Sequence, residues 1–407
     1  MEKQIEAIID SFRLDLDRRK LEVLDKVLFS LLLRKELLLL EGGSRPEILR
    51  LGKILSRYSD YRALISGRLF KSAPSARPER SFLIKHIYPA PTRLILLITH
   101  SCQLKCRYCR VRKFSDSMDE RVMLKGVELL FTSNREDLQL QFFGGEPLLK
   151  FDLVRKAVEY AKKLNRKFKR NLVFILTTNG IALTRDKVDY FKKNNFIIEC
   201  SIDGEIENQL KMRAAHSGRD YYSELTDNLR YLFSSGVPHY SISVVMPRNV
   251  WTMSRTFGHL VKLGFKRLQM NYSLGVFWPR PAIGQLFVQT EKIQRFLKKH
   301  QGIEFVNLSS LRREPVVLNS ELTVDCDGGI YLESGICLEE DFAEMKKKFL
   351  VADVQRARDI NLLASTPFQN FYRLSKVYAE ASPRFRKIIL NNIFLGQKYD
   401  KLIKKWI

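Results

Sequence analysis

Three of the six cysteines fall within eight positions, Cys102, Cys106 and Cys109, after an apolar run and a short polar turn. Three thiolates on one loop are soft ligands, which favour iron–sulfur clusters, zinc or copper(I) over hard cations. A structural zinc site uses four ligands, and a cubane held at every iron uses four cysteines. Three cysteines leave one iron of a cubane without a protein ligand, so this iron is open to a small molecule.

The segment Gly144-Gly145-Glu146 follows a second apolar run. Glycines let the backbone approach a ligand closely, and the Glu146 carboxylate can accept hydrogen bonds from an ammonium group. Alone, such a segment followed by proline is more often a turn than a binding site. Its place after a predicted strand, beside the cysteine loop, favours a binding site.

Four further residues follow later apolar runs, and each allows a structural and a functional interpretation. They are Thr178, Asn179, Ser201 and Arg213. Asparagine before glycine favours a tight turn and serine can cap a segment, but these side chains can also contact a sugar, a carboxylate or a substrate. An arginine in a loop is by default a surface residue, whereas a bidentate guanidinium can clamp a carboxylate. The residues alone leave both interpretations open.

Two histidines, His100 and His216, have a side chain suited to proton transfer. Neither has a paired carboxylate evident from the sequence. Both are therefore expected to be structural or exposed to solvent.

From about residue 93, short apolar runs alternate with amphipathic segments, which is the pattern of parallel βα units. Strands are predicted over Leu94–Thr99, Leu138–Phe143, Leu172–Thr177, Ile197–Ser201, Tyr240–Val245 and Arg267–Tyr272. Helices are predicted to start near Asp119, Phe151, Thr184, Tyr222 and Asn249. The fold class is therefore α/β, with a partial barrel or an open doubly wound sheet. In both architectures the carboxyl ends of the strands form the active face.

The chain has 407 residues, is 45% apolar and carries a formal net charge of +25. Six cysteines in a chain this long do not make a disulfide scaffold, and their clustering favours metal ligation in a reducing, cytoplasmic compartment. The N-terminus lacks an apolar signal core. Charges interrupt the apolar run Leu31–Leu40, which favours a buried helix over a transmembrane segment. The net charge suggests a polyanionic partner, namely nucleic acid, a membrane surface or an acidic peptide. Because no nucleic-acid-binding motif accompanies the charge, basic residues on solvated helix faces are the favoured interpretation.

The motif Cys102-x-x-x-Cys106-x-x-Cys109, with Tyr108 before the last cysteine, resembles the signature of the radical S-adenosylmethionine (radical SAM) superfamily. The segments Phe-Phe-Gly-Gly-Glu-Pro-Leu-Leu, Thr-Thr-Asn-Gly and Ser-Ile-Asp-Gly resemble the branch that contains anaerobic sulfatase maturases and peptide-modifying SPASM enzymes. The resemblance covers roughly Arg93 to Tyr272. It implies a partial (β/α)6 barrel with a small C-terminal α+β extension. Before this barrel, the helical spacing of Ile5, Ile8, Ile9 and Phe12 predicts an N-terminal helical region.

The resemblance also implies cofactors and residue roles. The three cysteines would hold one [4Fe–4S] cluster, whose open iron would bind the amino and carboxylate groups of SAM. Glu146 and the Gly144–Gly145 backbone would hold the SAM ammonium, and Tyr108 would lie near the adenine. Ser201 and Arg213 are candidates for the SAM carboxylate, and Thr178 or Asn179 for the ribose.

The C-terminal part of the chain departs from that branch, whose members usually carry further cysteines for auxiliary clusters. The hairpin-like segment Leu322–Glu333 has Glu333 where the branch usually has a cysteine, and too few cysteines remain for a second Cys₄ cluster. Cys326 and Cys337 are expected to be packed as small apolar residues, with a partial cluster that has one non-cysteine ligand as the alternative. The predicted divisions are 1–90 helical, 91–285 radical SAM core, 286–360 a SPASM-like or twitch-like extension without clusters, and 361–407 C-terminal helices.

The branch resemblance implies a radical SAM enzyme that modifies a peptide or protein and receives electrons from a low-potential donor such as flavodoxin or ferredoxin. The +25 charge keeps nucleic acid or a small anionic metabolite as alternative substrates, and phosphate binding would then weaken steeply with added salt. A non-catalytic metal-binding scaffold is a further alternative, which the SAM-contact motifs beside the cysteines disfavour.

Overall fold

The computed structural model describes residues 43–53, 91–309, 321–364 and 382–406, together with isolated residues before and between these ranges. Residues 45–53 are helical, within the N-terminal region for which helices were predicted. Most of the apolar run Leu31–Leu40 lies outside the described residues. None of the described helices is long and apolar enough to span a membrane.

The described chain is built on one curved sheet of ten strands in the order β12-β11-β10-β1-β3-β4-β5-β7-β8-β9. Six of them confirm the predicted strands to within one residue: β1 Arg93–Thr99, β3 Asp137–Gly144, β4 Asn171–Thr178, β5 Phe196–Ser201, β7 His239–Val245 and β8 Arg267–Tyr272. These six pair in parallel, so their carboxyl ends meet at one edge. The end strands β12 and β9 do not pair, and the sheet is an open, partial barrel.

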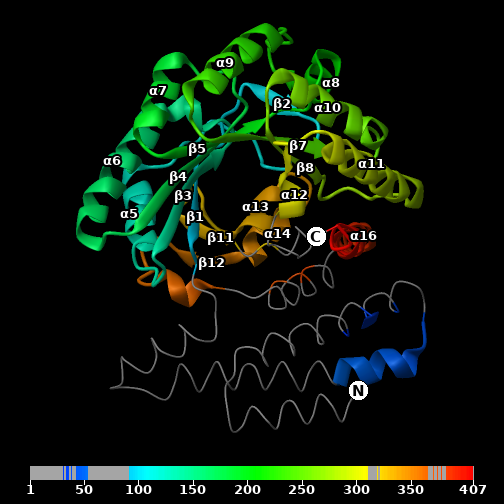
Figure 1. The fold of residues 1–407 in the computed structure, drawn as a ribbon. Helices are drawn as coiled ribbons and strands as arrows, with labels where there is room; N and C mark the ends of the chain where they lie inside the picture. Colours follow the sequence, from blue (N-terminus) through cyan, green and yellow to red (C-terminus); the bar gives the residue numbers. More distant parts are fainter. Residues whose placement is uncertain are drawn as a thin grey trace, which may run out of the picture.

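Helices connect these strands along the outer face of the curved sheet (Figure 1). They are α5 Glu120–Leu130, α6 Phe151–Phe168, α7 Arg185–Lys193, α9 Tyr222–Ser235 and α10 Met253–Leu263, followed by α11 Arg280–Lys299. The first five start within four residues of the predicted positions. The Asp119 side chain accepts a hydrogen bond from the Arg121 N–H and caps α5, which explains the sharp start of that helix.

Successive side chains of a strand point to opposite faces of the sheet, and here the two faces differ in polarity. Residues that face the outer helices are apolar, and Phe142, Phe174 and Phe196 stack there with ring centroids 5.2–6.4 Å apart. On the concave face, the Gln141 amide and the Thr177 hydroxyl donate to the buried Glu199 carboxylate at 3.0 and 2.6 Å. The interior of the partial barrel is therefore polar, whereas the layer between sheet and helices is the apolar core.

The C-terminal extension continues the same sheet. Strand β10 (Leu322–Val324) pairs in parallel with β1, and β11 (Gly329–Leu332) and β12 (Leu350–Asp353) follow as antiparallel neighbours. Two short helices, α13 (Glu333–Cys337) and α14 (Ala343–Lys348), lie on the concave side of the sheet (Figure 1). The extension therefore lies directly beside the strand that leads into the cysteine loop.

The remaining described elements complete the curved sheet and its helical layers. They are β2 Leu104–Cys106, η1 Pro147–Lys150, α8 Ile206–Met212, β6 Arg213–Ala215, η2 Val250–Thr252, β9 Glu304–Phe305, α12 Val306–Ser309, η4 Ile360–Leu363 and α16 Pro383–Ile403. Helix α16 lies in the segment for which C-terminal helices were predicted. It is joined to the turn before α11, because Asn391 and Asn392 bond the backbone at Trp278, Gly275 and Val276.

Candidate active site

The cysteine loop leaves the carboxyl end of β1 and is fastened to the rest of the site by a short second sheet. Strand β2 pairs antiparallel with β6, with Leu104 opposite Ala215 and Cys106 opposite Arg213. The Arg107 N–H donates to the Met212 carbonyl at 2.9 Å. This pairing places the predicted arginine beside a predicted cluster ligand, although a hundred residues separate them in the chain.

The backbone at Gly144 and Gly145 contacts the start of the cysteine loop. The Gly145 and Glu146 N–H groups donate to the carbonyls of Thr99 and Ser101 at 2.7 and 2.9 Å. A Cβ atom on Gly145 would lie 2.1 Å from the Ser101 oxygen, and one on Gly144, where φ is +142°, would lie 2.3 Å from the Thr99 oxygen. Only glycine allows the end of β3 to approach the loop this closely.

Glu146 is fully buried between the ends of β3 and β4. Its carboxylate accepts hydrogen bonds from the Thr178 hydroxyl at 2.8 Å, the Asn179 N–H at 2.8 Å and the Leu148 N–H at 3.1 Å. Burial raises the pKa of this carboxyl, and the three donors oppose the rise. The Glu146 side chain thus ties two predicted site segments together. Since its oxygens face these protein donors, the geometry favours a positioning role over the direct ammonium contact suggested by the sequence.

Thr178, Asn179 and Ser201 lie at neighbouring strand ends, as predicted. The Asn179 amide nitrogen is 3.9 Å from the Cys102 sulfur, which places it directly beside the cysteine loop. The Thr178 hydroxyl is committed to Glu146 and also accepts the Gly180 N–H at 3.1 Å. Ser201 ends β5 and is half-buried. Asn179 therefore lies beside the cysteine loop, whereas Thr178 contacts Glu146, which in turn bonds the Asn179 backbone.

Arg213 was expected in a loop but lies in strand β6, where it is 5% exposed. Its Nε donates to the buried Asp203 carboxylate at 2.9 Å, and the Tyr108 hydroxyl donates to the same oxygen at 2.6 Å. The guanidinium also lies over the Tyr108 ring, 5.2 Å from its centroid. Burial lowers the pKa of Arg213, but the negative charges of the groups around it, Asp203 first among them, together raise this pKa by more, so the guanidinium stays charged. Three residues from separate segments thus form one buried group beside Cys106.

Two neighbours of the loop have contacts that the sequence did not reveal. Lys113 lies beside the thiols of Cys109 and Cys102, whose negative charge raises the pKa of Lys113 although burial lowers it. His100, expected to stand alone, is fully buried and pairs with Asp325 at 2.7 Å. The distance of 225 positions between these partners hides the pair from local sequence patterns. His216 is exposed, as expected.

The chemistry of the donor set fits a cluster better than a single metal ion. Sulfur atoms bound to one tetrahedral zinc ion at about 2.3 Å lie about 3.8 Å apart. Among the described residues, only His100, Asp325 and Cys326 bring three candidate ligand atoms within 4.8 Å of one another, so the three loop thiols are spaced too widely for such an ion. Burial raises the pKa of Cys106 to about 12, which favours the neutral thiol, so binding of a metal centre would have to release its proton.

Comparisons with known proteins identify this arrangement. Residues 96–259 match the family model of the radical SAM superfamily. An uncharacterized protein of Methanocaldococcus jannaschii is 25% identical over 244 residues, which cover 60% of this chain and 79% of that protein. A cysteine-type anaerobic sulfatase-maturating enzyme of Clostridium novyi is 26% identical over 185 residues, which cover 43% of this chain and 49% of that enzyme. This chain therefore spans only about half of that curated enzyme's length.

The fold has solved counterparts. One structure, described as native anSMEcpe with bound AdoMet and Cp18Cys peptide, aligns with a TM-score of 0.60 at 17% identity and covers 77% of this chain and 98% of that chain. Residues 96–259 are therefore similar to the radical SAM superfamily, which indicates an enzyme, and the chain is also similar to anaerobic sulfatase-maturating enzymes.

Replacement of Arg213 by methionine is expected to destabilise the fold by about 3–5 kcal/mol, because it leaves the Asp203 carboxylate buried without its cation. Lys211→Met, on the exposed surface of α8, is the matched control and is expected to change stability by no more than about 0.5 kcal/mol. Urea unfolding followed by circular dichroism measures both. A loss below about 1 kcal/mol for Arg213→Met, the value of a surface pair, would contradict the buried pairing.

Proposed function

We propose that the chain reductively cleaves SAM at one [4Fe–4S] cluster bound by Cys102, Cys106 and Cys109. When bound, this group supplies the electron that breaks the sulfonium C–S bond, which yields methionine and a 5′-deoxyadenosyl radical for hydrogen abstraction. The observation that supports this proposal most is the seating of the three-cysteine loop on Gly144 and Gly145, at the strand edge where Asn179 and Arg213 converge.

The protein's own residues orient the cofactor and keep it from water. The Gly144–Gly145 backbone and the Asn179 side chain lie where SAM would approach the loop. The Arg213 Nε is held by Asp203, so the rest of the fixed guanidinium is available to bind the SAM carboxylate, with Ser201 as a second candidate. Tyr108, held by the same Asp203, is oriented for the adenine, and Thr178 and Glu146 support Asn179 from behind.

The proposed substrate is a peptide or protein. The support is the similarity to a sulfatase-maturating enzyme and the structural likeness to a protein described with a bound peptide. The polar concave face around Glu199 offers hydrogen-bonding partners to such a substrate. A low-potential flavodoxin or ferredoxin is proposed as electron donor, since the +25 charge of the chain favours docking of an acidic partner.

We further propose the division into an N-terminal helical region 1–90, a core 91–285, an extension 286–360 without auxiliary clusters, and C-terminal helices 361–407. The Cys326 thiol packs against the Leu97 carbonyl at 3.2 Å, which supports a structural role for it. The side chain of Cys337 is not among those described. A nucleic acid or small anionic metabolite is the alternative substrate that the net charge favours.

Anaerobic reconstitution tests the proposal. Reconstituted protein with dithionite and SAM is expected to form 5′-deoxyadenosine and to hold roughly four iron atoms per chain, the content of one cubane. Iron and sulfide analysis with chromatography of the products measures both. Protein that carries a cluster but makes no 5′-deoxyadenosine contradicts SAM cleavage, and roughly eight or more irons per chain contradict the single cluster.

A further inference from the structure

The cysteine loop closes on itself at a neck, where residues 98–100 meet residues 112–118. The backbone N–H of His100 donates to the Asp116 carbonyl at 3.0 Å, and the backbone N–H of Met118 donates to the Ile98 carbonyl at 2.8 Å. The Thr99 hydroxyl donates to the Asp116 carbonyl at 2.8 Å. All three cysteines lie in the segment between the two sides of this neck, so the neck determines where the thiols stand relative to β1.

His100 is the side chain that ties the neck together. Its Nδ1 lies 2.8 Å from the Arg112 carbonyl oxygen, on the returning side of the loop. Its ring stacks on Phe114 with centroids 4.0 Å apart and an interplanar angle of 17°. Because a carbonyl oxygen cannot donate, Nδ1 is the donor, and Nε2 is directed elsewhere.

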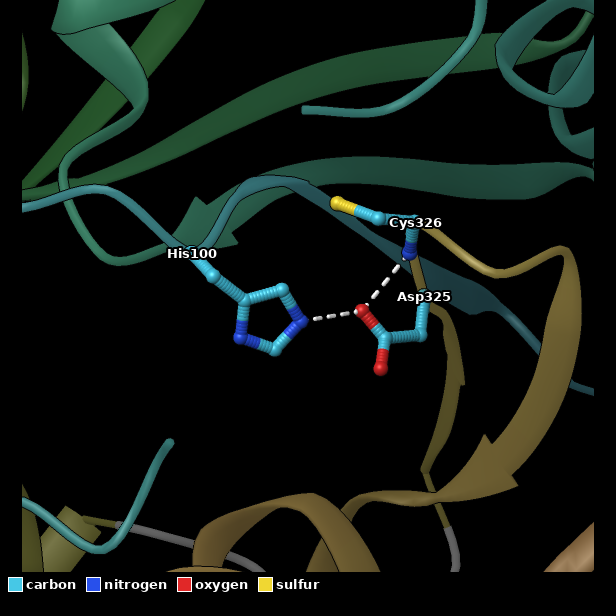
Figure 2. Close-up of side chains that lie close together, drawn as sticks. All are labelled: His100, Asp325 and Cys326. Carbon is cyan, nitrogen blue, oxygen red and sulfur yellow. Dashed lines mark hydrogen bonds and ion pairs between the residues drawn. The ribbon is translucent and has the colours of Figure 1, made fainter. Parts of the chain in front are cut away.

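That second nitrogen points out of the loop into the C-terminal extension. Figure 2 shows the His100 Nε2 directed at Oδ1 of Asp325, at a distance of 2.7 Å. Both side chains are fully buried. Asp325 is itself held firmly, because its Oδ1 accepts the Cys326 N–H at 2.6 Å and its Oδ2 forms an ion pair with Lys346 of α14 at 2.5 Å. The cysteine loop is thereby bonded to the β10–β11 turn.

A metal ion at this place fits the distances less well. Two ligands of one tetrahedral zinc ion, each at about 2.1 Å, lie about 3.4 Å apart, whereas the Nε2–Oδ1 separation of 2.7 Å is that of a charge-assisted hydrogen bond. The Cys326 sulfur lies within 4.8 Å of the His100 and Asp325 ligand atoms, but its hydrogen bond goes to the Leu97 carbonyl at 3.2 Å. The Lys346 ammonium already supplies a cation to Asp325.

We propose that Asp325 is a positioning residue that locks the neck of the cysteine loop through His100. The extension would then contribute to the site by a hydrogen bond in place of cluster ligands. The inference rests on the proposed function in one respect only: the lock would serve to hold Cys102, two residues beyond His100, in place as a cluster ligand. The contact itself is independent of that function.

Hydrogen exchange of the full chain over residues 98–118 tests the lock. Asp325→Asn removes the charge that faces His100 and is expected to speed exchange at the neck by about tenfold, the effect of weakening a charge-assisted hydrogen bond to a neutral one. Asp327→Asn is the matched control, since Asp327 lies on the same turn and also faces Lys346, at 3.4 Å, but does not contact His100. Exchange at the neck is expected to stay at the wild-type rate in that control.

Two substitutions of His100 distinguish its hydrogen bond to Asp325 from its hydrogen bond to the Arg112 carbonyl. They test the proposal even if Asp325→Asn does not fold. The amide nitrogen of asparagine stands near the place of Nδ1, and that of glutamine near Nε2. His100→Gln, which keeps a donor for Asp325, is expected to keep slower exchange than His100→Asn, which loses it. In the double variant of His100→Asn with Asp325→Asn, the effects are expected to be non-additive, as for directly bonded partners.

A second readout follows the cluster. In reduced, reconstituted protein, Asp325→Asn is expected to weaken the change that SAM causes in the electron paramagnetic resonance spectrum, whereas Asp327→Asn is expected to preserve it. The proposal is overturned by wild-type exchange at the neck in a folded Asp325→Asn, or by an equal effect of Asp327→Asn. It is also overturned if metal analysis finds a zinc ion that Asp325→Asn removes. Because exchange needs no SAM cleavage, failure of the lock and failure of the proposed enzyme activity are distinguishable.

Discussion

Reconstituted Cys106→Ala is expected to bind no stable [4Fe–4S] cluster and to form 5′-deoxyadenosine only at the level of a protein-free control. Two thiols cannot replace three as ligands of a site-differentiated cubane. The fold also fixes the place of this proposed ligand, since Cys106 stands opposite Arg213 in the β2–β6 pairing. Anaerobic assays with SAM and dithionite, with iron analysis of the same samples, measure the effect.

The control for this prediction is Cys200→Ala. Cys200 is buried in β5 and lies outside the loop, so its replacement costs packing but removes no ligand. It is expected to retain the iron content of the wild type and its SAM cleavage. Cleavage by Cys106→Ala at the wild-type rate would show that the radical chemistry is assigned to the wrong residues.

Gly145→Ala is expected to displace the cysteine loop and to remove most of the bound iron. The added Cβ would lie 2.1 Å from the Ser101 oxygen and 2.6 Å from the His100 oxygen, and both are backbone atoms that cannot rotate away. Overpacking of this kind costs about 1–3 kcal/mol or more, and here the strain falls on the two residues that precede Cys102. Iron content after reconstitution and the midpoint of urea unfolding measure the two effects.

The matched substitution is Gly284→Ala in helix α11, where the new Cβ would meet no atom within 4 Å. An alanine in an exposed helix interior is expected to stabilise the protein by about 0.5–1 kcal/mol and to leave the iron content unchanged. If Gly145→Ala also retained iron and stability, the close approach between β3 and the cysteine loop would not be a requirement of the site.

Local patterns in the sequence predicted much of the fold. The apolar runs and their spacing predicted six parallel strands and the starts of five helices, because the periods of strands and helices are properties of a few consecutive residues. The spacing of Cys102, Cys106 and Cys109 predicted a three-thiol ligand set, and the order of motifs at strand ends predicted that the candidate site lies at one edge of the sheet.

Other features depended on contacts between distant segments. The sequence did not reveal that β10 joins the sheet beside β1, and therefore did not reveal the His100–Asp325 pair. It placed Arg213 in a loop, whereas the β2–β6 pairing buries this residue against Asp203. It did not reveal that the Glu146 carboxylate accepts hydrogen bonds from Thr178, Asn179 and Leu148.

The sequence by itself thus determined which residues carry soft ligand atoms and on which strand ends the candidate site residues lie. Only the tertiary structure decided which of these residues touch one another and which serve as supports. The physical reason is that ligand chemistry and strand period are encoded locally, whereas the pairing of a buried charge is decided by the strands and loops that the fold brings beside it.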